Sequence, residues 1–381
     1  LAHALHDGYS SMIYLLLPSW QAEFALSLAQ VGVLKTLYSA AMSAGQVPAG
    51  RLGERSGEKL PLVAGTFVAA SAVLALHWAM MPPVLGLLLV FGGLGASVQH
   101  PLASTLISRA YRGSVLRTTL ATYNFAGDLG KMAIPGLLTV LIAAYSWRTG
   151  TELIGVLGLV TAAALLITLP PNGAGRAQEE QRTAAPGLPL PESVRRRAFA
   201  ALSAVGMLDS ATRTGLLTFL PFALAQKGAD AGVIGTALSL VFAGGAAGKF
   251  ACGALATRIG ILRTVAATEV GTALAIVLLL VLPLSFCLVL MPLLGIALNG
   301  TSSVLYGTVP ELAPNGREAR AFGFFYTVTI GADAVAPTFY GVVGDAIGLT
   351  GAILLVAIVV LVILPFLAAL RPALQERGRP A

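Results

Sequence analysis

Charged residues are scarce in this chain of 381 residues. They make up 11% of the sequence, whereas a soluble protein averages roughly a quarter, and hydrophobic residues make up 56%. A soluble fold of this length cannot bury that much apolar surface. The composition therefore excludes a soluble enzyme or binding module and indicates a protein that crosses a membrane many times.

Cysteine is nearly absent as well. Cys252 and Cys287 both lie in apolar runs, which excludes a disulfide framework and a cysteine-based metal site. The 43 glycines show no Gly-X-Y period, so the chain is not collagen-like. Residues 243–250 mimic a phosphate-binding loop but lack its first glycine and its Ser/Thr. We therefore expect no cofactor, and an ion gradient rather than ATP as the driving force.

Long apolar runs predict twelve membrane-spanning helices. Outside one polar stretch, residues 170–197, the chain divides into units of about 29 residues, enough for a helix of roughly 20 residues, a turn and some tilt. The predicted fold class is an all-α membrane protein built from two pseudo-symmetric six-helix halves. The predicted spans are 1–23, 29–52, 60–80, 83–107, 118–143, 150–169, 198–226, 231–256, 263–283, 285–309, 318–343 and 349–370.

The two halves are copies of one unit. They match at an offset of 202 or 203 residues, and six spans between the copies give both the same orientation, with a substrate site expected between them. We predict an N-terminal half at 1–169, a cytoplasmic linker at 170–197 and a C-terminal half with a short tail at 198–381. The matched pairs are Asp7 and Asp209, Pro18 and Pro221, Gly32 and Gly235, Gly45 and Gly248, Gly50 and Gly253, Arg55 and Arg258, Gly57 and Gly260, and Pro135 and Pro337.

Basic residues gather on one side of the predicted membrane. Of the 24 Lys and Arg, 18 fall on that side and only Arg148 and Lys227 on the other. Positive residues are retained in the cytoplasm, so both ends of this chain and the linker are expected there, in an inner membrane. The net charge of +7 is then a topology signal, and no nucleic-acid partner is expected.

The loop between the second and third spans carries a motif. Residues 50–59 read GRLGERSGEK and resemble the loop signature of the major facilitator transporters, with Glu54 in the acidic position. A degenerate copy at 253–260 has Thr257 in place of the acid. Glycines permit a tight turn and close helix approach, and charges at an interface between halves break when the halves rock. We expect a gate formed by Gly50, Glu54, Arg55, Gly57, Arg258 and Lys249.

The first and fourth spans resemble one branch of that family more closely. LAHALHD at 1–7, followed by Pro18 and Gly32, and GLGASVQHP at 93–101 are similar to the fosmidomycin-resistance exporters. The resemblance implies two halves that rock about a central substrate site, and export. Leu102 and Thr105 replace the charged residues of that branch, and Leu89 stands where many drug antiporters have arginine, so the antibiotic itself is not implied.

Eight ionisable residues fall inside predicted spans, where a charge costs several kcal/mol unless it is paired or hydrated. Two pairs share a helix face, Asp128 with Lys131 and Asp209 with Arg213. Each pair is either a structural ion pair or one that a substrate or proton switches. The eight residues are Asp7, Lys35, Asp128, Lys131, Asp209, Arg213, Lys249 and Asp333.

The family resemblance implies contacts between the halves, Lys249 with Asp128 and Asp333 with Lys35. Alternatively, Lys249 reaches the membrane surface from its helix end. Because Lys131 and Asp333 occupy equivalent repeat positions with opposite charge, the site is expected to be electrostatically asymmetric and to suit an anionic or zwitterionic substrate.

Histidines add two further hypotheses. His100 precedes Pro101 inside an apolar span, where the proline frees a backbone carbonyl, so His100 either satisfies backbone or lines a wet pocket. A metal site at His3, His6 and Asp7 is not expected, because position 6 does not share a face with the other two and no third span is indicated.

These observations predict a secondary transporter and not an enzyme. The expected function is proton-coupled export of a small organic compound by a monomer, with a proton-coupled importer of an organic anion and a non-transporting sensor as alternatives. We assign proton coupling to Asp128 ahead of Asp7 and Asp333. The substrate is assigned to Arg213, Asp209, Lys131, His100 and Lys35.

Overall fold

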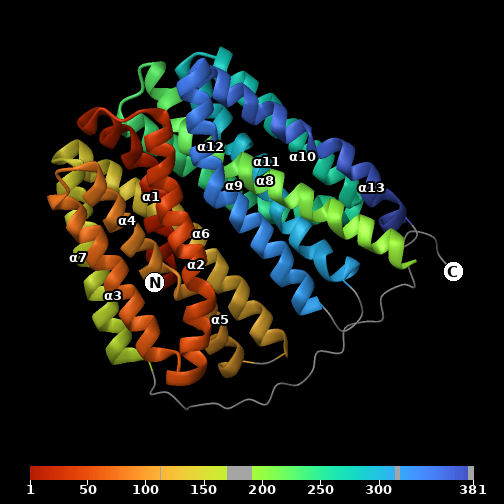
Figure 1. The fold of residues 1–381 in the computed structure, drawn as a ribbon, viewed down its shortest axis with the longest axis horizontal. Coiled ribbons are helices and arrows are strands. Elements are labelled where there is room, and N and C mark those ends of the chain that lie inside the picture. Colours follow the sequence, from red (N-terminus) through yellow and green to blue (C-terminus); the bar gives the residue numbers. More distant parts are fainter. Residues whose placement is uncertain (112, 170–190, 314–317, 376–381) are drawn as a thin grey trace. The chain divides into compact units, whose positions relative to one another are not determined.

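The computed structural model describes residues 1–111, 113–169, 191–313 and 318–375, and their regular structure is helical (Figure 1). Helix boundaries fall at glycines, prolines and polar caps. Ser27, for example, caps the start of the helix that follows it and forms a capping box with Gln30. The helices are α1 (Ala2–Phe24), α2 (Leu28–Ser56), α3 (Lys59–Ala75), the 3₁₀ turn η1 (Leu76–Trp78), α4 (Pro82–Ala96), α5 (Gln99–Ala110), α6 (Gly113–Ala144), α7 (Trp147–Thr168), α8 (Glu192–Gln226), α9 (Ala231–Ile259), α10 (Ile261–Val281), α11 (Leu284–Leu312), α12 (Glu318–Leu361) and α13 (Ile363–Gln375).

These helices build twelve spans, which confirms the predicted fold class. In the first half, α3 with η1 forms the third span and α4 with α5 the fourth. In the second half, α12 contains two spans, because Gly348 at φ 83° breaks its helical geometry and only glycine adopts that conformation readily. The twelfth span runs from this kink through α13.

Hydropathy alone identifies fewer spans. Eight stretches are long and apolar enough to cross a membrane, and the last of them, Gly323–Leu374, is 52 residues long and holds two spans. The stretches do not include α1, α2 and α8, which carry buried charges at Asp7, Lys35 and Asp209. Charge inside the bundle does not by itself hide a span, because α6 with Asp128 and α10 with Glu269 are among the eight stretches.

Two boundaries differ from the prediction. The fourth span is broken between Ala96 and Gln99, because Pro101 has no N–H to donate to the carbonyl of Ser97. The seventh span begins at Glu192, so residues 192–197 belong to α8 rather than to the predicted linker. The rest of that linker, up to residue 190, lies outside the described residues.

The chain forms two compact units. One comprises Leu1–Glu179 with Leu224–Ser239, and the other comprises Glu180–Ala223 with Leu240–Ala381. In the first unit α1 packs along α6, α2 along α4, and α3 against both α4 and α7 (Figure 1). In the second, α10 packs against α11, α12 and α13.

Equivalent pairs of spans come into close contact at glycines within each of the two units. In the first, a Cβ on Gly130 of α6 would lie 1.8 Å from the carbonyl oxygen of Ala4 on α1. In the second, a Cβ on Gly215 of α8 would lie 2.4 Å from the Tyr340 ring on α12. The same holds for α2 with α4 at Gly93 and for α9 with α11 at Gly244. Spans 1 and 5 thus pack as spans 7 and 11 do, and spans 2 and 4 as spans 8 and 10 do.

Candidate functional site

The first unit holds a buried cluster of alternating charge. Asp7 lies on α1, and its Oδ2 is 3.1 Å from the Nζ of Lys131 on α6. The same Nζ donates to Oδ1 of Asp128, one turn earlier on α6, at 3.3 Å. The two acids are 7% and 8% exposed, and both carboxylates are within ion-pair distance of this one ammonium group. The predicted pair on α6 is present, and Asp7 extends it to a second helix.

Two glycines of α6 make room for this cluster. A Cβ on Gly127 would lie 2.6 Å from Oδ2 of Asp7 and 2.4 Å from Nε2 of His3. Gly130, one turn on, allows the backbones of α1 and α6 to touch. A larger side chain at Gly127 would displace the carboxylate that Lys131 binds, and one at Gly130 would push α1 away from α6.

Histidine and tyrosine rings border the other oxygen of Asp7. His3 Nδ1 is 3.8 Å from Asp7 Oδ1, and His100 Nε2, on α5, is 3.7 Å from the same oxygen. The His3 ring stacks on Tyr123 of α6 with ring centres 3.9 Å apart. His6 does not join this group, because its Nε2 lies 3.0 Å from the hydroxyl of Thr66 on α3.

Lys35 is held by aromatic neighbours in the first unit. Its Nζ donates to Ser39 Oγ at 2.9 Å and lies 4.9 Å from the ring centre of Tyr14 and 5.5 Å from that of Tyr38. Cation–π contact and a hydroxyl acceptor make burial of this lysine tolerable. The expected contacts of Lys35 with Asp333, and of Lys249 with Asp128, would join the two units and stay predictions.

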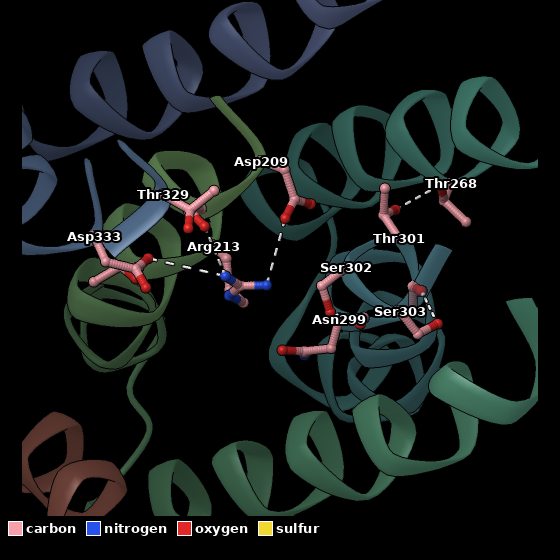
Figure 2. A network of polar contacts seen from close by, with 12 residues as sticks. Asp209, Arg213, Thr268, Asn299, Thr301, Ser302, Ser303, Thr329 and Asp333 are labelled. Atoms are coloured by element: carbon pink, nitrogen blue, oxygen red, sulfur yellow. Dashed lines mark hydrogen bonds and ion pairs between the residues drawn. The ribbon is translucent and has the colours of Figure 1, made fainter. Parts of the chain in front are cut away.

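The second unit holds its own cluster around Arg213 of α8 (Figure 2). Its Nη1 donates to Asp209 Oδ2 at 3.4 Å and its Nη2 to Ser210 Oγ at 3.0 Å, both on the same helix. Nη2 also lies 3.9 Å from Oδ1 of Asp333 on α12, which accepts a hydrogen bond from Thr214 at 2.5 Å. As in the first unit, one cation lies between two acids.

Glu269 of α10 is an acid that the sequence interpretation overlooked. It is 2% exposed, and its Oε1 has no hydrogen-bond partner among the described residues. Its hydrogen-bonding neighbour is Thr301 of α11, whose hydroxyl donates to Thr268 at 2.7 Å (Figure 2). A glutamate in an apolar span, 263–283, was the signal that could have found it.

The two predicted gate loops share a turn geometry. Gly57 at the end of α2 has φ 81° and Gly260 between α9 and α10 has φ 90°, at equivalent repeat positions. Glu54, Arg55 and Arg258 are exposed on the adjoining helix ends. The turns explain the glycines, while the gating role of these charges stays a prediction.

The other two members of the predicted gate occupy different surroundings. No described atom lies within 4 Å of where a Cβ on Gly50 would stand, so space does not require a glycine there. The backbone oxygen of Lys249, on α9, accepts a hydrogen bond from Ser303 of α11 at 3.2 Å.

Curated relatives match part of the chain. The 4-hydroxybenzoate transporter PcaK of Pseudomonas aeruginosa is 32% identical over 154 residues, which is 40% of this chain and 34% of the relative. The fosmidomycin resistance protein of Escherichia coli is 28% identical over 145 residues, 38% of this chain and 36% of the relative. The chain thus spans about a third of the length of the curated relatives it matches.

Solved structures match the whole fold. A bacterial homologue of the human lysosomal transporter Spinster, inward-facing and unoccupied, has a TM-score of 0.80 at 16% identity and covers 100% of this chain and 97% of its own. The nucleoside transporter NupG, solved as a point mutant, has a TM-score of 0.80 at 13% identity and covers 97% of each chain.

The family model described as Major Facilitator Superfamily matches residues 1–221 and again residues 202–381. The two matches overlap at residues 202–221 and together cover the whole chain. The chain is a membrane protein of small-molecule transport rather than an enzyme, and it belongs to the Major Facilitator Superfamily.

Proposed function

We propose that this protein carries a small organic anion across the membrane by alternating access and that protons move with the anion. The observation that carries the proposal is the pair of buried clusters in which one base lies between two acids. In each resting cluster the cation is already compensated, Lys131 by Asp7 and Asp128, and Arg213 by Asp209 and Asp333. An anionic substrate can bind the lysine or arginine only after one of the two acids stops pairing with it.

Protonation of one acid supplies that release. When Asp128 takes up a proton, Lys131 loses one of its two counter-charges and can bind an anionic group. Proton and anion then favour each other on the same side of the membrane, which is the condition for co-transport. We assign the proton to Asp128 and anion binding to Lys131 and Arg213, with Asp7, Asp209 and Asp333 holding the two bases in place.

Relatives support an anionic substrate. The name of PcaK specifies 4-hydroxybenzoate, and a probable L-galactonate transporter of Escherichia coli is 25% identical over 149 residues, 37% of this chain and 31% of that relative. Both named compounds are carboxylates. We therefore place aromatic and sugar carboxylates first among the substrates to be tested.

Export is the second candidate. It is supported by the motifs of the first and fourth spans and by the similarity to the fosmidomycin resistance protein. An exporter that exchanges substrate for protons requires that a proton displace the substrate instead of assisting it. The sign of the coupling therefore separates the two functions.

The proposed location is an inner membrane with both ends of this chain in the cytoplasm. The bias of 18 of the 24 basic residues to one side supports this orientation. The gate of Glu54 and Arg55 would then face the cytoplasm, in a protein that acts as a monomer.

The test is transport in proteoliposomes with an imposed pH gradient and a panel of labelled carboxylates, including 4-hydroxybenzoate. Co-transport predicts accumulation when the lumen is alkaline and loss of accumulation when the gradient is reversed. Arg213→Ala should abolish binding of the carboxylate substrate. Asp209→Asn should free Arg213 from its acid partner and so tighten substrate binding. Equal loss from both variants, together with poor expression, would show that the pair is structural, and accumulation with the lumen acidic would favour the exporter.

A further inference from the structure

Three potential ligand atoms converge in the first unit without a hydrogen bond between them. They are Nδ1 of His3, Oδ1 of Asp7 and Nε2 of His100, all within 4.8 Å of one another. The distances to Asp7 are 3.8 Å and 3.7 Å, too long for hydrogen bonds. Ligands that share a tetrahedral metal ion lie about 3.3 Å apart, so an ion would need to draw each imidazole about 0.5 Å closer to the carboxylate and the two imidazoles up to about 1.5 Å closer to each other.

The arrangement of Asp7 suits a ligating carboxylate. Oδ1 faces both histidines, while Oδ2 is bound by Lys131 at 3.1 Å. Metal-bound carboxylates are commonly hydrogen-bonded through their other oxygen. Asp128 compensates the same lysine, so with neutral histidines the cluster carries one net negative charge and can accept a divalent cation.

His3 is positioned for this purpose. It is 4% exposed, and its Nδ1 has no hydrogen-bond partner in the described part of the chain. Tyr123 stacks on the ring, and Gly127 leaves the space that the ring fills, since a Cβ there would lie 2.4 Å from Nε2. A buried nitrogen that is oriented but unsatisfied costs free energy unless something binds it.

His100 leaves the site open on one side. Its side chain is 45% exposed, whereas those of His3 and Asp7 are 4% and 10% exposed. An ion can therefore reach the site past His100 and keep a water in the remaining coordination position. The expectation against a metal considered only residues 3, 6 and 7 of one span and found no ligand from another span, whereas His100 of α5 lies beside His3 and Asp7.

We propose that His3, Asp7 and His100 form a binding site for a divalent transition-metal ion. Two imidazoles and one carboxylate favour Zn²⁺, Co²⁺ or Ni²⁺ over Mg²⁺ and Ca²⁺, which prefer oxygen ligands. The ion would tie α1 to α5. The site goes beyond the proposed transport function and does not depend on it.

The experiment uses the full chain, purified in detergent with a tag that contains no histidine. The chain has four histidines, so single alanine variants cover all of them. Co²⁺ should bind wild type at one ion per chain, with the visible absorption of a nitrogen- and oxygen-ligated ion, and Zn²⁺ should displace it and raise the unfolding temperature. His3→Ala and His100→Ala should weaken binding at least about tenfold.

His6→Ala and His77→Ala are the matched controls and should bind like wild type, because His6 contacts Thr66 and His77 pairs with Glu152. His100→Asn repeats the test if His100→Ala does not fold. The proposal would be overturned if folded wild type did not bind Co²⁺, or if the His3 and His100 variants bound it as tightly as wild type. Either result would hold whatever the outcome of the transport assays.

Discussion

Replacing Gly130 with alanine should separate α1 from α6 and weaken the cluster that the two helices share. The new Cβ would lie 1.8 Å from the Ala4 carbonyl oxygen, and the nearest atoms are all backbone, so no side chain can move aside. A tolerable carbon–oxygen contact is about 3.3 Å, which requires a displacement of about 1.5 Å.

The cost can be estimated from two sources. Overpacking of this kind costs about 1 to 3 kcal/mol. If the helices move apart by the full displacement, the Asp7–Lys131 distance grows from 3.1 Å to about 4.6 Å, and at an effective dielectric constant of about 20 the attraction falls by at most about 2 kcal/mol, because the lysine can partly follow.

Thermal unfolding in detergent and transport in proteoliposomes measure the two effects. We expect Gly130→Ala to lower the unfolding temperature and to reduce pH-driven transport. Gly136→Ala is the control on the same helix, because its Cβ would meet only Ser239 Oγ among the described atoms, at 3.6 Å, an ordinary contact. The control should be neutral or gain up to about 1 kcal/mol from helix propensity. Equal stability and activity of the two variants would refute the close contact of α1 and α6.

Three further substitutions test single roles. Asp128→Asn should lose pH-driven accumulation at least about tenfold while keeping substrate exchange at equal pH, since exchange needs no net proton movement; continued accumulation against a gradient would exclude Asp128 as the carrier. Glu54→Gln should shift the distance distribution between labels in the two halves without changing the unfolding temperature, and an unshifted distribution would exclude the proposed gate. Glu269→Gln should unfold within about 2 °C of wild type, because an amide of the same shape replaces a carboxyl group whose Oε1 has no partner among the described residues, whereas a large loss of stability would show that the carboxyl group makes contacts that an amide cannot replace.

The helix order was predictable because its signals are local. Apolar runs and prolines are properties of neighbouring residues, and the repeat shows in the sequence itself, where the turn glycines Gly57 and Gly260 recur one repeat apart. The break in the fourth span was equally open to prediction, since Pro101 must leave the carbonyl of Ser97 without its helical partner.

The candidate site was predictable only where both members lie on one helix. Asp128 with Lys131 and Asp209 with Arg213 follow from spacings of three and four residues. The contact of Asp7 with Lys131 depends instead on how close α1 comes to α6, and that distance is set by Gly130. A single sequence does not state which of its many glycines lie at a helix contact.

Glu269 was missed for a different reason. Glu269 has no base on its own helix face, so spacing along α10 gives it no partner. Its neighbour Thr301 is supplied by α11, which packs against α10. A contact between helices of this kind cannot be inferred from spacing along one helix.

The two clusters differ in how a helix movement would act on them. In the first unit the base and Asp7 lie on different helices, so any separation of α1 from α6 lengthens their 3.1 Å contact directly, while Asp128 travels with Lys131. In the second unit Arg213 and Asp209 share α8 and move together, and the contact across helices, 3.9 Å to Asp333, is already the longer one. A movement that separated α1 from α6 would therefore release Lys131 from Asp7, whereas a movement of α8 as a rigid helix would leave the Arg213–Asp209 pair intact. We therefore expect the proposed coupling of proton and substrate to movement in the first unit, and the proposed anion site at Arg213 in the second.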